Sequence, residues 1–147
     1  MNGTMFFSSN WHYNISMTKE TSKSELYTEY YQNDKKKVEG YYKDGNKDGK
    51  WTWFYNDGQK SLEVNYKNSK KDGKWTEWDG DGESQKEGNY KDGKKDGKWT
   101  YSAHSGYLDV KEEWKDGLLH GEVSICSMNT GVHYLWFFEG IDITDRI

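Results

Sequence analysis

The sequence predicts an all-β protein, an elongated and twisted antiparallel β-meander, and three observations lead to this prediction. A ten-residue stretch occurs three times with minor changes, at 43–52, 67–76 and 91–100. Each copy belongs to a unit with two runs of strand-forming residues separated by turn signals. Aromatic residues make up 17% of the chain, including 8 Trp and 12 Tyr, so rings supply the apolar surface that a sheet needs.

The composition indicates an ordered protein with a thin, aromatic core. Hydrophobic residues reach only 32%, and the mean hydropathy of -1.23 is one half of the signature of disorder. The other half is missing, because the net charge is only -4 and aromatic residues are abundant. The 147 residues suffice for one ordinary domain.

The repeat has a period of 24 residues. The glycine before "KWT" is Gly49, Gly73 or Gly97, and steps of 24 lead forward to Gly121 and back to Glu25. Three further columns keep their chemistry: Tyr42, Tyr66, Tyr90 and Trp114; Tyr27, Trp51, Trp75 and Trp99, with Val123 last; Thr28, Thr52, Thr76, Thr100 and Ser124. We therefore expect a repeat array over 25–140 with units starting near 25, 49, 73, 97 and 121, an N-terminal cap or degenerate repeat over 1–24, and a C-terminal tail over 141–147.

Within one unit, the run at 50–55 predicts a strand, and "NDGQ" predicts the turn that closes a hairpin. The run at 60–66 alternates in polarity, with Leu62 on one face and Glu63 on the other, and predicts the second strand. The stretch at 67–73 is expected to form a longer loop that connects hairpins.

Two strands per 24 residues with short connections must pair antiparallel, because a parallel connection needs a longer crossover. This gives about five hairpins and about ten strands, in a single sheet or curled into a half-pipe. The runs at 5–7 and 134–138 differ from the repeats and are expected to cap the ends of the array.

The glycines, lysines and aspartates of the repeated stretch have a structural explanation. Glycine supplies the positive φ that tight turns require, and Lys and Asp keep a connector soluble and discourage pairing between sheet edges. We therefore interpret "KDGKKDG" as a structural connector and not as an active site.

The units resemble MORN repeats. The match is closest to the bacterial variant, which the stretch "YKDGNKDGKWTWFYNDGQKSLEVNY" at 42–66 fits almost throughout, and the resemblance covers about 25–140. It implies MORN-like hairpins and a binding protein, because many bacterial proteins with such repeats look like antitoxin or immunity components. MORN proteins at large act as interaction scaffolds, some of them near membranes.

No catalytic, cofactor or metal site is expected. One cysteine, Cys126, cannot supply a thiolate cluster, and no histidine has a metal-type partner at close spacing. Glu39, Glu63 and Glu87 form a column whose members should lie roughly 10 Å apart, two strands from one another. Because the position recurs in every unit, we interpret it as a solvated face paired with lysines.

Columns that vary between units are free to carry function. Glu29, Trp53, Glu77 and Tyr101 form one such column, and Trp78 belongs to the next. Large rings of this kind dominate protein interfaces, so we predict these five residues as the partner-binding set. Alternation places Trp53 and Tyr101 on the face of Trp51 and directs Trp78 to the other, and we favour the face of Trp53. The alternative is that the rings thicken the core.

The predicted function is a non-catalytic protein-binding module, an antitoxin or immunity protein that occludes a partner toxin. The alternatives are a structural or membrane-associated scaffold, which includes self-association, and a single-stranded nucleic-acid binder. The acidic net charge disfavours the nucleic-acid hypothesis, since basic residues alternate with aspartates. The single cysteine and the lack of a long apolar run favour a cytoplasmic protein without a transmembrane segment.

Overall fold

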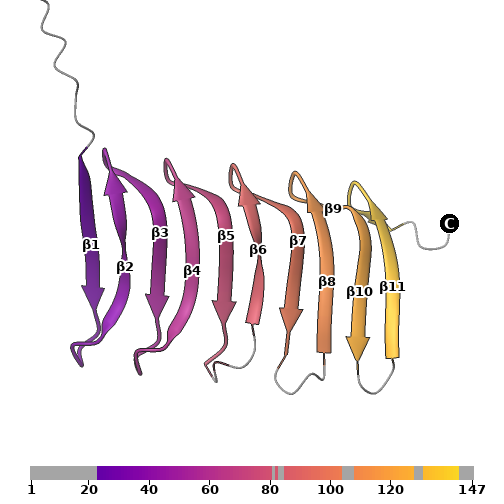
Figure 1. Cartoon of the computed structure of the whole chain (residues 1–147), viewed down its shortest axis with the longest axis horizontal. Helices are drawn as coiled ribbons and strands as arrows, with labels where there is room; N and C mark the ends of the chain where they lie inside the picture. The colour runs from indigo at the N-terminus through magenta and orange to yellow at the C-terminus, as the bar shows by residue number, and fades with distance from the viewer. Residues whose placement is uncertain (1–22, 81, 83–84, 104–107, 128–130, 143–147) are drawn as a thin grey trace, which may run out of the picture.

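The computed structural model describes residues 23–80, 82, 85–103, 108–127 and 131–142, and these form strands without a helix (Figure 1). The strands are β1 (Ser24–Tyr30), β2 (Lys36–Lys43), β3 (Asn46–Phe54), β4 (Lys60–Lys67), β5 (Lys70–Trp78), β6 (Gln85–Lys91), β7 (Lys94–Ser102), β8 (Leu108–Lys115), β9 (Leu118–Leu119), β10 (Gly121–Ser127), β11 (Gly131–Phe138) and β12 (Ile141–Asp142). The predicted cap at 5–7 lies outside the described residues.

All of these strands belong to one sheet, and their spatial order follows the chain from β1 to β12, with the short β9 pairing only with β8. Every pairing is antiparallel, from β1 with β2 to β11 with β12. Figure 1 shows the strands side by side in a single open layer, without the curl of a half-pipe. The predicted β-meander is therefore confirmed as a single open sheet.

The connectors between successive 24-residue units are shorter than the sequence predicts. Only two residues form each turn, and both have positive φ, as at Asp44 (50°) and Gly45 (78°). This is the backbone of a type I′ turn, whose twist matches that of the flanking strands. The lysine, aspartate and glycine of the predicted connector already lie within β3, β5 and β7, so the prediction of a longer loop at 67–73 is wrong. Equivalent turns are 68–69, 92–93, 116–117 and 139–140.

The turns at the other ends of the strands are longer. Between β3 and β4, the amide of Tyr55 donates to the carbonyl of Gln59 at 2.7 Å, and the amide of Gly58 donates to that of Tyr55 at 2.9 Å. Gly58 has a φ of 95°, which suits the left-handed position of a three-residue hairpin loop. The predicted "NDGQ" turn is therefore confirmed.

The core is a line of tryptophan rings on one face of the sheet. Trp51, Trp75 and Trp99 are 1%, 8% and 2% exposed. The ring of Trp51 lies on Gly40, where an added Cβ would approach the ring to 2.2 Å, and its indole N–H donates to the carbonyl of Tyr41 at 3.1 Å. Trp99 repeats this packing on Gly88 with a donor–acceptor distance of 3.1 Å to Asn89.

The rings come together in pairs because small and branched residues alternate beneath them. Trp75 and Trp99 meet over Gly88 with ring centroids 5.1 Å apart, whereas Val64 pairs with both Trp51 and Trp75 and separates them. A single layer can bury large rings in this way, since each ring is covered by its neighbours along the sheet as well as by the strand beneath it.

Candidate protein-binding face

Alternation along the strands divides the sheet into two faces of different chemistry. We call the side of Trp51 the aromatic face and the side of Thr52 the threonine–glutamate face. Cross-strand partners share a face, so the registers Trp51↔Val64 and Thr52↔Glu63 assign neighbouring residues to each side.

Lysines cover the outer side of the rings on the aromatic face. The ammonium group of Lys47 lies 4.1 Å from the ring centroid of Trp51 and 5.3 Å from that of Trp53. Lys95 lies 4.3 Å from the ring of Trp99 and 4.1 Å from that of Trp114. These are cation–π distances, so the lysines stabilise the rings while their charged groups stay at the surface.

Burial against the rings changes the chemistry of two of these lysines. Loss of solvent around the ammonium groups lowers the pKa of Lys47 and that of Lys95. For Lys95 the carboxylate of Glu112, 3.7 Å away, acts in the opposite direction and supports the charged form. The column of Lys47, Lys71 and Lys95 was visible in the sequence as another position that recurs every 24 residues, but its contact with the rings was not predicted.

The structure brings four of the predicted binding residues into one straight row on the aromatic face. We call it the outer row, because it lies next to the tryptophan line on the side of the longer turns. From β1 to β10 the registers connect Glu29, Val38, Trp53, Leu62, Glu77, Lys86, Tyr101, Val110 and Ile125.

The side chains of the outer row differ in their solvent exposure and in their contacts. Trp53 is half-buried, and its ring centroid lies 6.0 Å from that of Trp51. Tyr101 is half-buried and Glu77 is exposed. Glu29 pairs with Lys37 at 2.7 Å, and the hydrogen bond and charge of this lysine lower the pKa of the glutamate. Trp53 thus contributes to the core as well as to the surface.

Leu62, Lys86 and Val110 belong to the outer row but were not among the predicted binding residues. Leu62 and Val110 flank Trp53 and Tyr101 and make two apolar patches, and the opposite pair Glu77↔Lys86 separates them. The signal was present in the sequence, since Leu62 and Val110 occupy one column of the 24-residue period together with Lys86. Only the strand register shows that this column lies beside Trp53 and Tyr101.

Trp78 lies on the threonine–glutamate face, opposite to the outer row, as alternation predicts. Its cross-strand partner is Gln85, and the ammonium group of Lys60 lies 5.9 Å from its ring centroid. Its carbonyl accepts a hydrogen bond of 2.7 Å from the hydroxyl of Tyr55. One flat interface therefore cannot include both Trp53 and Trp78.

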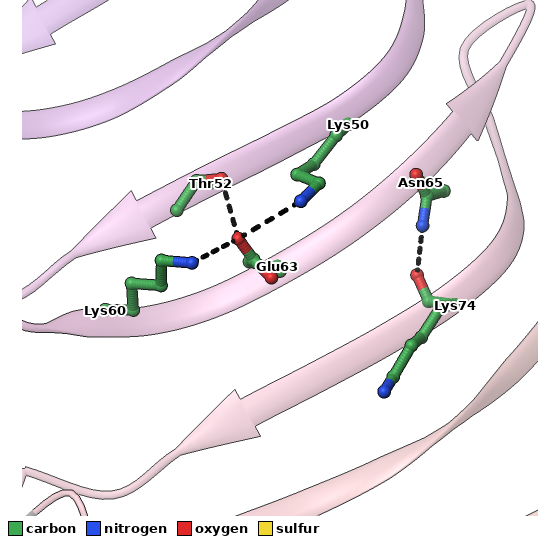
Figure 2. Close-up of polar contacts among 6 residues, drawn as sticks. All are labelled: Lys50, Thr52, Lys60, Glu63, Asn65 and Lys74. Atoms are coloured by element: carbon green, nitrogen blue, oxygen red, sulfur yellow. Dashed lines mark hydrogen bonds and ion pairs between the residues drawn. The ribbon is translucent and has the colours of Figure 1, made fainter.

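Threonine and glutamate alternate along the other face. The registers run Thr28, Glu39, Thr52, Glu63, Thr76, Glu87 and Thr100. Figure 2 shows the centre of this row, where one carboxylate oxygen of Glu63 lies 2.8 Å from the ammonium of Lys60, 3.7 Å from that of Lys50 and 3.4 Å from the hydroxyl of Thr52. Partial burial alone raises the pKa of Glu63, but these partners outweigh it and lower the pKa.

The predicted pairing of the glutamate column with lysines is confirmed. Glu39 pairs with Lys36 at 2.5 Å, and Glu87 pairs with Lys74 at 3.0 Å, as Glu63 does with Lys60. Carboxylates that pair with lysines in this way suit a structural surface. Within the described ranges, no group of three or more His, Cys, Asp or Glu side chains is placed to hold a metal ion.

The strands β3, β5 and β7 thus each start after a type I′ turn, and the strands that follow them, β4, β6 and β8, end at the next type I′ turn. A three-residue turn joins β3 to β4. Three consecutive segments of the chain match the MORN repeat variant. They are 26–44, 47–68 and 71–92, and each ends at the first residue of a type I′ turn. No curated protein matches the chain.

The match to this repeat variant suggests a repeat protein-binding module. The described part of the chain holds no helix that is long and apolar enough to cross a membrane.

Proposed function

We propose that the chain is a non-catalytic antitoxin or immunity protein of a bacterial cytoplasm, which binds a basic toxin through the outer row and occludes it. The observation that supports the proposal most is the alignment of Glu29, Trp53, Glu77 and Tyr101 in one row of the aromatic face. These are variable positions of the repeat, so the shared fold does not dictate their identity.

The composition of the outer row suits a protein interface. Trp53 and Tyr101 are rings at the surface with apolar neighbours, the residue types that carry most of the binding energy in protein complexes. They lie four strands apart, about 19 Å at the usual strand spacing, so a single domain can contact both.

The acidic residues of the row favour a basic partner. Glu77 is exposed between the two apolar patches, and the chain has a net charge of -4. Complementary charge across an interface raises the rate of association and suppresses wrong partners more than it raises affinity. An antitoxin must reach its toxin quickly, so this property suits the proposed role.

Affinity capture from the native host, followed by growth assays, tests the proposal. The wild-type chain is expected to retain a protein that arrests growth when it is expressed alone and becomes harmless when it is co-expressed with this chain. Trp53→Ala and Tyr101→Ala should lose the captured protein, while Trp78→Ala, which alters the opposite face, should keep it. A captured protein without effect on growth would refute the antitoxin role, and retention by both outer-row variants would refute the proposed interface.

A further inference from the structure

The threonine–glutamate face changes its charge pattern over β7, β8 and β10. Lys111 occupies the column that holds glutamate at 39, 63 and 87, and it lies between Thr100 and Ser124 in the row. The hydroxyl column and Lys98, which corresponds to Lys50 and Lys74, are kept. In this unit the repeat therefore keeps one lysine and the hydroxyl, has Leu108 in the column of Lys36 and Lys60, and replaces the carboxylate by an ammonium group.

The earlier units show what these donors bind. Lys74 reaches the carboxylate of Glu87 at 3.0 Å, and the Lys50 and Thr52 donors meet at Glu63 (Figure 2). The carboxylate of the repeat thus sits within reach of one or two lysines, and for Glu63 also of a hydroxyl. A carboxylate from outside the chain can occupy the equivalent position beside Lys98, Lys111 and Thr100.

The surface is hollowed at this place. A hollow of about 250 Å³ is lined by Lys98, Trp99, Thr100, Lys111, Glu112, Glu113, Glu122 and Ser124. Lys98 and Glu113 are cross-strand partners, yet none of the ion pairs within the described ranges joins Lys98 or Lys111 to Glu113 or Glu122. The carboxylate of Glu112 lies beside Lys95 and Trp114 on the aromatic face, so four charged residues of this face line the hollow, with no ion pair among them.

The charges of these four groups sum to zero, so they match a ligand that carries both signs. Two ammonium groups suit a carboxylate, and Glu113 and Glu122 beside them suit an ammonium group and repel a simple anion. We infer that this hollow binds a zwitterionic amino acid, with its carboxylate at Lys98, Lys111 and Thr100 and its ammonium group at Glu113 and Glu122. This site lies on the face opposite to the outer row and does not depend on the proposed antitoxin role.

Nuclear magnetic resonance titration of the full chain with glycine tests the inference. The amide signals of Thr100 and Ser124 should shift in a saturable manner, while acetate and methylammonium, which each carry half of the ligand, should bind about tenfold or more weakly. Equal binding of acetate or of inorganic phosphate would overturn the zwitterion assignment and leave a simple anion site.

Lys111→Glu is the decisive variant, because it restores the residue that the other units have in this column. It should keep the melting temperature and weaken glycine binding at least about tenfold. Lys98→Gln should weaken binding without adding a carboxylate to the site. Lys91→Glu, which makes the same charge change at an exposed end of β6, serves as the control and should bind glycine like the wild type. Unchanged binding by Lys111→Glu and Lys98→Gln would refute the site.

Discussion

Gly40 and Gly88 are required by the rings that lie on them and not by their backbone angles. At both positions an added Cβ would stand within 2.3 Å of an indole ring atom, and neither has positive φ. Sequence reasoning identified the constant tryptophan column but not this contact, since the column of Gly40, Val64, Gly88 and Glu112 looks variable. The alternation becomes meaningful only when the register places these residues under the rings.

Gly88→Ala should therefore destabilise the protein by about 3 kcal/mol, because the new methyl group forces the Trp99 ring out of its place. Urea unfolding measures the change. Gly80→Ala is the matched control, since nothing lies within 4 Å of an added Cβ there and the φ is not positive. A loss below about 0.5 kcal/mol for Gly88→Ala would show that the ring moves aside freely.

Trp75→Ala should cost more stability than Trp78→Ala. Trp75 is 8% exposed and packs against the ring of Trp99, so its truncation should cost roughly 3–5 kcal/mol. Trp78 is half-buried on the face without the tryptophan line. Urea unfolding of the two variants compares them directly, and equal losses would mean that constant and variable columns do not differ in their structural role.

The lowered pKa of Glu63 gives the stability a pH dependence with a defined sign. A carboxylate whose folded pKa lies below its ordinary value of 4.5 stabilises the fold above that value, and this contribution disappears as the pH falls through the folded pKa. Glu63→Gln should lower the stability by up to about 1 kcal/mol at neutral pH, and the difference should shrink as the pH falls through the folded pKa.

Thermal unfolding of the wild type and of Glu63→Gln, measured from neutral to acidic pH, tests this prediction. Glu77→Gln is the control, because Glu77 is exposed and Lys86 is the only charged one of its two neighbours in the outer row, Leu62 and Lys86. A difference between wild type and Glu63→Gln that persists at the acidic end would contradict the assignment of the stabilisation to the ionised carboxylate.

At the scale of the elements, the positions of the turns were predictable from the sequence. The length of the connectors between successive units was not. The lysines and aspartates after the Asp-Gly turn have low strand propensity, so the sequence predicts a loop there. Tertiary contacts override this propensity, because Lys71 pairs with Tyr66 and its ammonium group lies 4.7 Å from the ring centroid of Tyr90. Such contacts between units cannot be read from one unit alone.

The type I′ turns require residues that tolerate positive φ. Gly93 has a φ of 86°, and nothing lies within 4 Å of an added Cβ, so Gly93→Ala tests the backbone without a clash. The variant should lose about 1 kcal/mol in urea unfolding. Ser69 takes the same position in its turn at a φ of 63°, where its hydroxyl accepts from the amide of Lys47 at 3.1 Å. A neutral Gly93→Ala would mean that the turn changes type at no cost.

At the scale of the whole molecule, the sheet is predictable from the period, and the exposure of its first strand is not. Tyr27 belongs to the column of Trp51, Trp75 and Trp99, yet it is 40% exposed. Its strand β1 pairs only with β2 among the described strands, so Tyr27 has ring contacts only with Tyr42 and Trp51 there. A column predicts burial only where the described sheet continues on both sides.

Residues that stabilise the fold and residues proposed to bind a partner occupy different columns of the repeat. Columns that every unit keeps form the tryptophan line and the turns, whereas the outer row combines residues from variable columns into one surface. The row could be predicted in part, since alternation placed Trp53 and Tyr101 on one face. Leu62, Lys86 and Val110 joined them only through the strand register.

The most direct test of this separation is a calorimetric titration of the captured partner against two variants of the chain. The double variant Trp53→Ala/Tyr101→Ala removes both rings of the outer row and should weaken binding by about a thousandfold, since two central anchors cost about 2 kcal/mol each. Trp78→Ala should bind the partner like the wild type. Loss of binding by Trp78→Ala together with unchanged affinity of a folded double variant would contradict the assignment of the aromatic face as the binding surface.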